Sequence, residues 1–295
     1  MKIIYFFLAA LFFCTNVYCQ SADSTIKKNA RVKRYKVNYY VTGSIIVVGL
    51  VSDYYAIGRL KNKPKITSEE YAFITTDQQK NLINPIDRWA LNQPASDRDL
   101  FKTISDYGQD VIFLLPALLM IDKKIRKDWL DLLLMYVEGH CVTFTFYNYS
   151  PLGPTFIDRF RPYVYYNTDV LTPDYIMNSN NTRKSFFSGH VGSCTYSTFF
   201  MTKVYCDYHP ELGAKKFLLY LAASVPALAL GYARIRSLDH FPSDVAVGFG
   251  LGAIIGIVVP ELHKNRKYKD FSLGMFTSPY GMGLSVGWNM ASNTK

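Results

Sequence analysis

The feature that most constrains this chain is a series of apolar segments, each close to the length of a helix that crosses a lipid bilayer. Crossing the hydrocarbon core takes about 20 mostly apolar residues. The strongest segments cover residues 105–121, 129–148, 189–206, 216–233 and 244–260. The mean hydropathy of the whole chain is only +0.02, although 49% of its residues are hydrophobic, and the apolar residues are clustered in these segments. This clustering predicts an all-α fold, a polytopic membrane helical bundle with five or six spans.

Basic residues flank these segments and indicate how the chain crosses the membrane. The block 263–269 follows the last segment and is expected in the cytoplasm. Counting backwards puts 234–243 outside, Lys215 and Lys216 inside, 149–188 outside and 122–128 inside. The net charge of +10 is therefore interpreted as topology, and no nucleic-acid partner is expected.

The N-terminal part fits this scheme less well. Residues 1–19 have the pattern of a signal peptide with cleavage near Cys19. They precede an N-terminal segment, 20–84, with a doubtful span at 39–57 that contains Gly43, Gly49 and Asp53. A cleaved signal starts the mature chain outside, whereas a span at 39–57 needs it inside. We expect 39–57 to lie in the interface or to re-enter without crossing.

The C-terminal tail, 263–295, contains a stretch that alternates around glycine and proline. Residues 271–288 have this pattern. Such alternation is typical of a small β-hairpin.

Two outer connections gather unusual polar residues at one membrane face. The first contains Arg161 and ends at Ser188-Gly189-His190, where an apolar helix is expected to begin. The unpaired N–H groups of a helix start bind anions. In the second connection Pro242 is expected to open the last helix, so that Asp244 can turn back to hold one nitrogen of His240.

These residue types suit phosphoryl transfer. An imidazole held by a carboxylate is a base or a nucleophile, which describes His240 with Asp244. Arg161 and Arg234 carry planar forks that match phosphate oxygens, and His190 can protonate a leaving oxygen. The set predicts metal-free transfer through a phosphohistidine, with no cofactor.

The remaining charges of the second connection have a simpler interpretation. Arg236 and Asp239 are expected to form a solvated pair near the headgroups.

The motifs R-P, S-G-H and R-x5-H-x3-D, between membrane helices, resemble those of the type 2 phosphatidic acid phosphatase (PAP2) superfamily. The resemblance covers a domain at residues 85–262 and implies a bundle of PAP2 type. It implies the following residue roles: His240 as nucleophile, Asp244 as its partner, His190 as general acid, and Arg161, Arg234, Ser188 and Gly189 as phosphate binders. It also implies a bacterial inner-membrane enzyme whose site faces the periplasm.

The chain departs from the family pattern at three positions. Pro154 stands where the family has a lysine, Phe187 precedes Ser188, and Ala233 precedes Arg234. The lysine matters most, since it contacts a phosphate oxygen in the family. Its possible substitutes in this chain are Arg159, Arg183 and Lys184.

The resemblance leaves several functions open. The first is hydrolysis of a lipid phosphate or diphosphate: undecaprenyl diphosphate, phosphatidate, phosphatidylglycerophosphate or a lipid A phosphate. The alternative is a non-catalytic membrane protein that binds anionic headgroups with the same arginines. A third, vanadate-dependent halide oxidation, belongs to relatives that resemble soluble proteins, so the spans count against it.

Overall fold

The computed structural model describes residues 33–265, 271–278 and 281–288. The predicted signal peptide at 1–19 lies outside the described residues. The α-helices are α2 (Tyr39–Lys61), α3 (Ser68–Ile74), α4 (Asp77–Leu82), α5 (Pro85–Arg88), α6 (Arg98–Leu114), α7 (Trp129–Tyr149), α8 (Pro173–Asn178), α9 (Gly189–Tyr208), α10 (Lys216–Arg236) and α11 (Pro242–His263). Short 3-10 helices are η1 (Trp89–Asn92), η2 (Ala95–Asp97), η3 (Leu115–Ile121), η4 (Arg126–Asp128), η5 (Pro162–Tyr165) and η6 (Pro210–Lys215).

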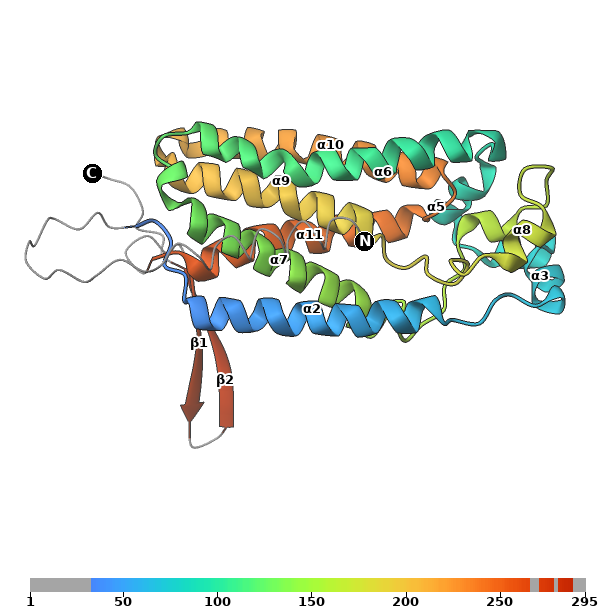
Figure 1. The fold of residues 1–295 in the computed structure, drawn as a ribbon, viewed down its shortest axis with the longest axis horizontal. Coiled ribbons are helices and arrows are strands. Elements are labelled where there is room, and N and C mark those ends of the chain that lie inside the picture. Colours follow the sequence, from blue (N-terminus) through green and yellow to red (C-terminus); the bar gives the residue numbers. More distant parts are fainter. Residues whose placement is uncertain (1–32, 266–270, 279–280, 289–295) are drawn as a thin grey trace, which may run out of the picture. The chain divides into compact units, whose positions relative to one another are not determined.

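Helix α9 is the centre of a bundle of long helices. It packs against α6, α7, α10 and α11, and α2 lies along α7 (Figure 1). The side chains of α9 are buried over most of its length, including Ser193, Thr195 and Ser197. Because neighbouring helices enclose α9, its hydroxyl side chains pack and bond within the protein and do not face lipid.

Glycines set the close contact between α9 and α11. A Cβ atom on Gly252 would lie 2.3 Å from the carbonyl oxygen of Gly192. One turn earlier, a Cβ on Gly248 would lie 2.5 Å from the Ser188 carbonyl oxygen. The backbones of the two helices therefore approach closely, as small residues allow in membrane bundles.

Four helical segments are long and apolar enough to cross a membrane: Tyr39–Lys61, Ala95–Ile121, Pro210–Arg236 and Pro242–His263. The other two long helices, α7 and α9, are the more enclosed in the bundle. The expected all-α membrane bundle is confirmed. One boundary differs, because the helical segment predicted to start near residue 105 already begins as α6 at Arg98.

The expectation for residues 39–57 was wrong in its physical premise. Gly43, Gly49 and Asp53 do not interrupt the segment, and α2 is one continuous helix of 23 residues. Gly49 lies against α7, where an added Cβ would be 2.7 Å from Cβ of Cys141. Asp53 accepts a hydrogen bond from Asn148 Nδ2 at 2.9 Å. Both residues serve the contact between α2 and α7.

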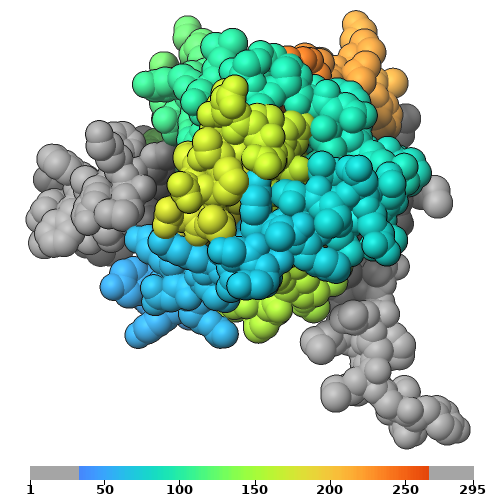
Figure 2. Space-filling model, turned by 90° about the vertical axis from the view of Figure 1, so that its right-hand side faces the viewer, coloured from blue at the N-terminus to red at the C-terminus, as the bar shows by residue number. Residues whose placement is uncertain are grey.

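One end of the bundle carries the shorter elements. Helices α3, α5 and α8 gather there with the connections between the long helices (Figure 1). Figure 2 shows this end, formed largely by the cyan segment around residues 60–100 and the yellow-green segment around 165–185. These two connections cover the end of the bundle at which α6, α9 and α11 begin.

The predicted hairpin in the tail is present. Strands β1 (Phe271–Ser278) and β2 (Gly281–Trp288) pair antiparallel, with Phe271 opposite Trp288 and Ser278 opposite Gly281.

Candidate active site

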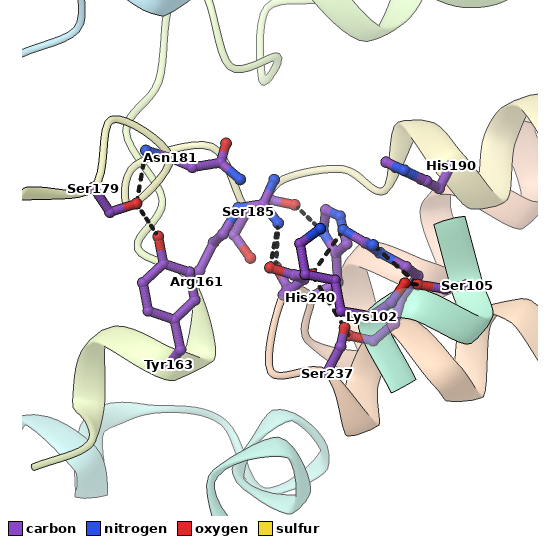
Figure 3. A network of polar contacts seen from close by, with 12 residues as sticks. Lys102, Ser105, Arg161, Tyr163, Ser179, Asn181, Ser185, His190, Ser237 and His240 are labelled. Atoms are coloured by element: carbon purple, nitrogen blue, oxygen red, sulfur yellow. Dashed lines mark hydrogen bonds and ion pairs between the residues drawn. The ribbon is translucent and has the colours of Figure 1, made fainter. Parts of the chain in front are cut away.

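A polar cavity of about 690 Å³ lies at this end of the bundle. Its wall combines residues from α6, α7, the connection before α9, the first turn of α9, the last turn of α10 and the connection between α10 and α11. Figure 3 shows some of them, including Lys102, Arg161, His190 and His240. Five of the seven predicted site residues line it: Arg161, Gly189, His190, Arg234 and His240. Ser188 and Asp244 lie behind its surface, both fully buried.

His240 is held in one orientation by the chain before α9. Its Nδ1 lies 2.6 Å from the carbonyl oxygen of Ser185. A carbonyl only accepts hydrogen bonds, so the contact places the proton on Nδ1 and leaves the lone pair on Nε2. Burial, reinforced by the nearby Arg161 guanidinium, lowers the pKa of His240 to about 4. The imidazole is therefore neutral at pH 7 and can act as a nucleophile or base.

Asp244 does not hold His240 in the expected way. Its Oδ2 lies 3.8 Å from His240 Nδ1, too far for a hydrogen bond. That oxygen instead accepts bonds from Ser185 Oγ at 2.6 Å and from the Phe241 N–H at 2.8 Å. Asp244 thus fixes Ser185, whose carbonyl in turn orients the imidazole. This indirect arrangement could not be predicted, because Ser185 belongs to none of the motifs and contacts His240 through its backbone carbonyl, not through its side chain.

A further carboxylate, Asp87 of α5, supports this arrangement and was missed. Arg159 bridges Asp244 and Asp87, with Nη2 at 2.7 Å from Asp87 Oδ2. Asp87 also accepts bonds from the N–H and hydroxyl of Ser243, at 2.9 and 2.7 Å. These bonds and Arg159 outweigh the opposing effect of burial and hold the pKa of Asp87 below its usual value. The start of α11 is therefore tied to the segment before α6.

Asp239 lies in a different environment from the one expected. It is not solvated with Arg236 but is 1% exposed. Its Oδ1 faces Arg161 Nη1 at 3.1 Å, and its Oδ2 faces Arg234 Nη2 at 2.9 Å. Burial raises the pKa of Asp239, yet the two arginines outweigh this effect and hold the pKa below its usual range. Asp239 is thus the shared counter-ion of both predicted phosphate-binding arginines.

Arg236 points elsewhere. It pairs with Asp97 and lies over the Phe101 ring, with its guanidinium carbon 4.7 Å from the ring centre. It does not line the cavity.

The start of α9 presents His190 to the cavity. Ser188 is the N-cap, and its hydroxyl accepts the Val191 N–H at 3.4 Å. The N–H groups of Gly189 and His190 precede the first intrahelical hydrogen bond. His190 Nε2 lies 3.6 Å from Asp106 Oδ1, and its side chain is 34% exposed. The predicted anion site at this helix start therefore rests on Gly189 and His190, while the Ser188 hydroxyl is occupied in capping.

None of the three residues proposed to replace the family's lysine lines the cavity. Arg159 is paired with Asp87 and Asp244, as described above. Arg183 pairs with Glu70 at 2.5 Å and donates to the Pro64 carbonyl at 3.1 Å. Burial, together with the nearby Arg161, lowers the pKa of Lys184 to about 8. The additional cations of the cavity come instead from α6, as Arg98 and Lys102.

Within residues 33–265, no three or more His, Cys, Asp or Glu side chains are grouped as metal ligands. Glu138, the acidic residue within α7, pairs with His263, whose Nε2 lies 2.9 Å from Glu138 Oε2.

Comparison with known proteins finds similarity to one family. The sequence model of the PAP2 superfamily matches residues 128–268. Phosphatidylglycerophosphatase B of Bacillus subtilis (strain 168) is 29% identical over 162 residues, which are 52% of this chain and 70% of that protein. Undecaprenyl-diphosphatase of Sulfolobus acidocaldarius is 24% identical over 179 residues, 60% of this chain and 76% of that protein.

A solved structure is also similar. It is the crystal structure of a transmembrane PAP2 type phosphatidylglycerolphosphate phosphatase from Bacillus subtilis. It matches with a TM-score of 0.40 and 20% identity, over 75% of this chain and 94% of that chain.

Proposed function

We propose that this chain, which the PAP2 superfamily model matches over residues 128–268, is a membrane phosphatase of that superfamily that hydrolyses a lipid phosphate or diphosphate through a phosphohistidine at His240, without a metal ion. The observation that carries the proposal is the environment of His240. A neutral imidazole, with its Nδ1 proton fixed on the Ser185 carbonyl, lines a cavity with two arginines and a second histidine.

The first step is attack by His240 Nε2 on phosphorus. As the N–P bond forms, the P–O bond to the leaving group breaks, and His190 donates a proton to the departing oxygen. Positive charge appears on the His240 imidazole and is stabilised by the Ser185 carbonyl. Arg161, Arg234 and the first N–H groups of α9 stabilise the negative charge on the phosphoryl oxygens.

The second step is hydrolysis of the phosphohistidine. His190, now deprotonated, takes a proton from a water molecule, whose oxygen attacks phosphorus as the N–P bond breaks. His240 returns to its neutral state and inorganic phosphate leaves. Burial and the nearby Arg234 lower the pKa of His190, and Asp106 beside it opposes this effect by favouring the protonated imidazole.

The substrate is proposed to be a lipid because the cavity opens among helices long and apolar enough for a membrane. A headgroup phosphate can enter the polar end while its tail remains in lipid. The two relatives are named for phosphatidylglycerophosphate and undecaprenyl diphosphate. Both remain candidates for this chain, together with phosphatidate and lipid A phosphates.

The site is proposed to face the periplasm from the bacterial inner membrane. The cavity lies at the start of α9 and α11, whereas α11 ends before the basic block at 263–269. Basic blocks favour the cytoplasm, so the opposite end, with the cavity, is outside.

The proposal is tested by phosphate release from undecaprenyl diphosphate, from phosphatidate or phosphatidylglycerophosphate, and from lipid A phosphates, these three classes being assayed with full-length protein purified in detergent. We expect release from at least one class, undiminished by chelator, and lost in His240→Ala. An inactive wild type that still binds anionic lipids would support the headgroup-binding alternative. Activity that chelator removes and a divalent ion restores would contradict the metal-free mechanism.

A further inference from the structure

The cavity contains a third arginine that no motif predicts. Arg98 is the first residue of α6 and is 6% exposed. Its guanidinium carbon lies 4.9 Å from the ring centre of Tyr163 and 5.5 Å from that of Tyr175. Nη1 also donates to the Tyr175 hydroxyl at 3.1 Å. Two aromatic rings and a hydrogen bond thus hold a long side chain in place against the cavity.

Arg98 shares a buried counter-ion with the two predicted phosphate-binding arginines, in addition to the exposed Asp99, whose Oδ1 lies 3.4 Å from Arg98 Nη1. Its Nη2 lies 3.8 Å from Asp239 Oδ1, the same oxygen that faces Arg161. Arg234 occupies the other oxygen of Asp239. Asp106 gives Arg234 a second partner, at 3.0 Å, but also binds Lys102. Three guanidiniums therefore gather around a single buried carboxylate, an arrangement that favours an anionic ligand.

The unused hydrogen-bond donors of these arginines also favour an anionic ligand. Among the residues that the structure describes, the buried Nε atoms of Arg98, Arg161 and Arg234 have no hydrogen-bond partner. An unpartnered buried donor is costly, and all three side chains line the cavity. Phosphate oxygens are acceptors of the geometry that such forks bind.

We propose that Arg98 is a third phosphate-binding arginine of this cavity and takes the place of the lysine that is absent at Pro154. The inference rests on the proposed function. Arg98 precedes the region matched by the family model, residues 128–268, so this chain supplies the cation from a different element. The Arg98 guanidinium lies over the ring of Tyr163, and Figure 3 shows Tyr163 near Arg161.

The test compares two arginines in purified full-length protein. Arg98→Gln removes the charge while keeping a donor for Tyr175. Arg236→Gln is the matched control, since Arg236 also has an unpartnered Nε but does not line the cavity. The measurements are KM and kcat for a lipid phosphate that the wild type hydrolyses, and inhibition by inorganic phosphate.

We expect Arg98→Gln to raise KM and the inhibition constant of phosphate by about tenfold or more, as loss of a charged hydrogen bond predicts. Arg98→Lys, which keeps the charge, should recover part of this loss. Arg236→Gln should stay within about twofold of wild type. Unchanged KM and phosphate inhibition in Arg98→Gln would overturn the inference.

A second measurement separates this inference from the proposed function. If the wild type releases no phosphate from any lipid, the proposed function fails, but phosphate binding can still be followed by thermal stability. Inorganic phosphate should then raise the melting temperature of wild type and of Arg236→Gln, but much less that of Arg98→Gln. An equal rise in all three proteins would overturn the role of Arg98.

Discussion

Asp239 determines how much positive charge the cavity can hold without a ligand. It is buried and contacts Arg161 and Arg234 through different oxygens. Ser237 Oγ adds a hydrogen bond at 3.1 Å. Removing the charge of one partner in a buried ion pair commonly costs about 3–5 kcal/mol, because the other charge is left uncompensated.

We predict that Asp239→Asn lowers the melting temperature in phosphate-free buffer, by an amount equivalent to about 3 kcal/mol. Added inorganic phosphate should stabilise this variant more than the wild type, because phosphate then replaces the missing negative charge. The control is Asp97→Asn, which removes the charged partner of Arg236. This pair is partly exposed, so its loss should lower the free energy of unfolding only slightly. Equal losses in the two variants would contradict the role of Asp239.

His240 provides a prediction about pH. Its pKa is lowered to about 4 in the folded protein, against about 6.5 in an unfolded chain. Between these values the unfolded state binds more protons, so stability rises with pH and is lost as pH falls from about 6.5 towards 4. On acidification from pH 7 to pH 5 the wild type should lose about 2 kcal/mol more stability than His240→Gln, since the slope reaches about 1.4 kcal/mol per pH unit only below about pH 6.5. Parallel losses in thermal unfolding would rule out a lowered pKa.

The residues of the site differ in how far the sequence reveals them. Arg161, His190, Arg234 and His240 follow from motif spacing, and all four line the cavity. Asp87 and Arg98 lie in a polar segment without a motif. They reach the site only because the connections before α6 and α9 fold over the same end of the bundle (Figure 2).

At the scale of elements, the pair α9 and α11 carries both histidines. His190 is at the start of α9, and His240 lies two residues before the first residue of α11, Pro242. The distance between the two helices is limited by Gly252, whose backbone touches Gly192. The separation of the two histidines therefore depends on a glycine contact outside the cavity.

Gly252→Ala should reduce both stability and activity, because the new Cβ would lie 2.3 Å from the Gly192 carbonyl oxygen. Overpacking of this kind costs about 1–3 kcal/mol. Gly250→Ala is a matched control on the same helix, since nothing lies within 4 Å of its Cβ. Thermal unfolding and phosphate release of both variants check the prediction, which fails if Gly252→Ala behaves like Gly250→Ala.

The helices themselves were predictable from apolar length, whereas their polar ends were not. The first turns of α6 contain Arg98, Lys102 and Asp106, so hydropathy placed the start of the helix too late. In α2 the glycines and Asp53 suggested an interruption, but partners on α7 accommodate them. Both errors have one cause: the sequence does not show which polar residues find partners inside the bundle.

For the whole molecule, the direction of α2 decides the topology. The Lys36 N–H donates to the His263 carbonyl at 2.8 Å, so the chain before α2 lies beside the end of α11. Beyond the other end of α2, Lys63 pairs with Asp158 at 2.6 Å, in the connection near the cavity. Helix α2 therefore runs from one end of the bundle to the other, as a sixth span would.

Reporters fused after residue 36, ahead of α2, and after residue 62, beyond it, test this topology. We expect residue 36 in the cytoplasm and residue 62 in the periplasm. The chain then enters α2 from the cytoplasmic side, which disagrees with cleavage of residues 1–19 as a secretory signal. Both reporters on one side of the membrane would show that α2 does not cross.

The central claim is that His240 carries the phosphoryl group. Its most direct test is a single turnover with a lipid substrate labelled in the scissile phosphate, stopped by alkaline denaturant and followed by peptide mapping. The mechanism predicts transient label on the peptide that contains His240, absent in His240→Ala and longer-lived in His190→Ala. Turnover without label on His240, or label that persists in His240→Ala, would contradict it.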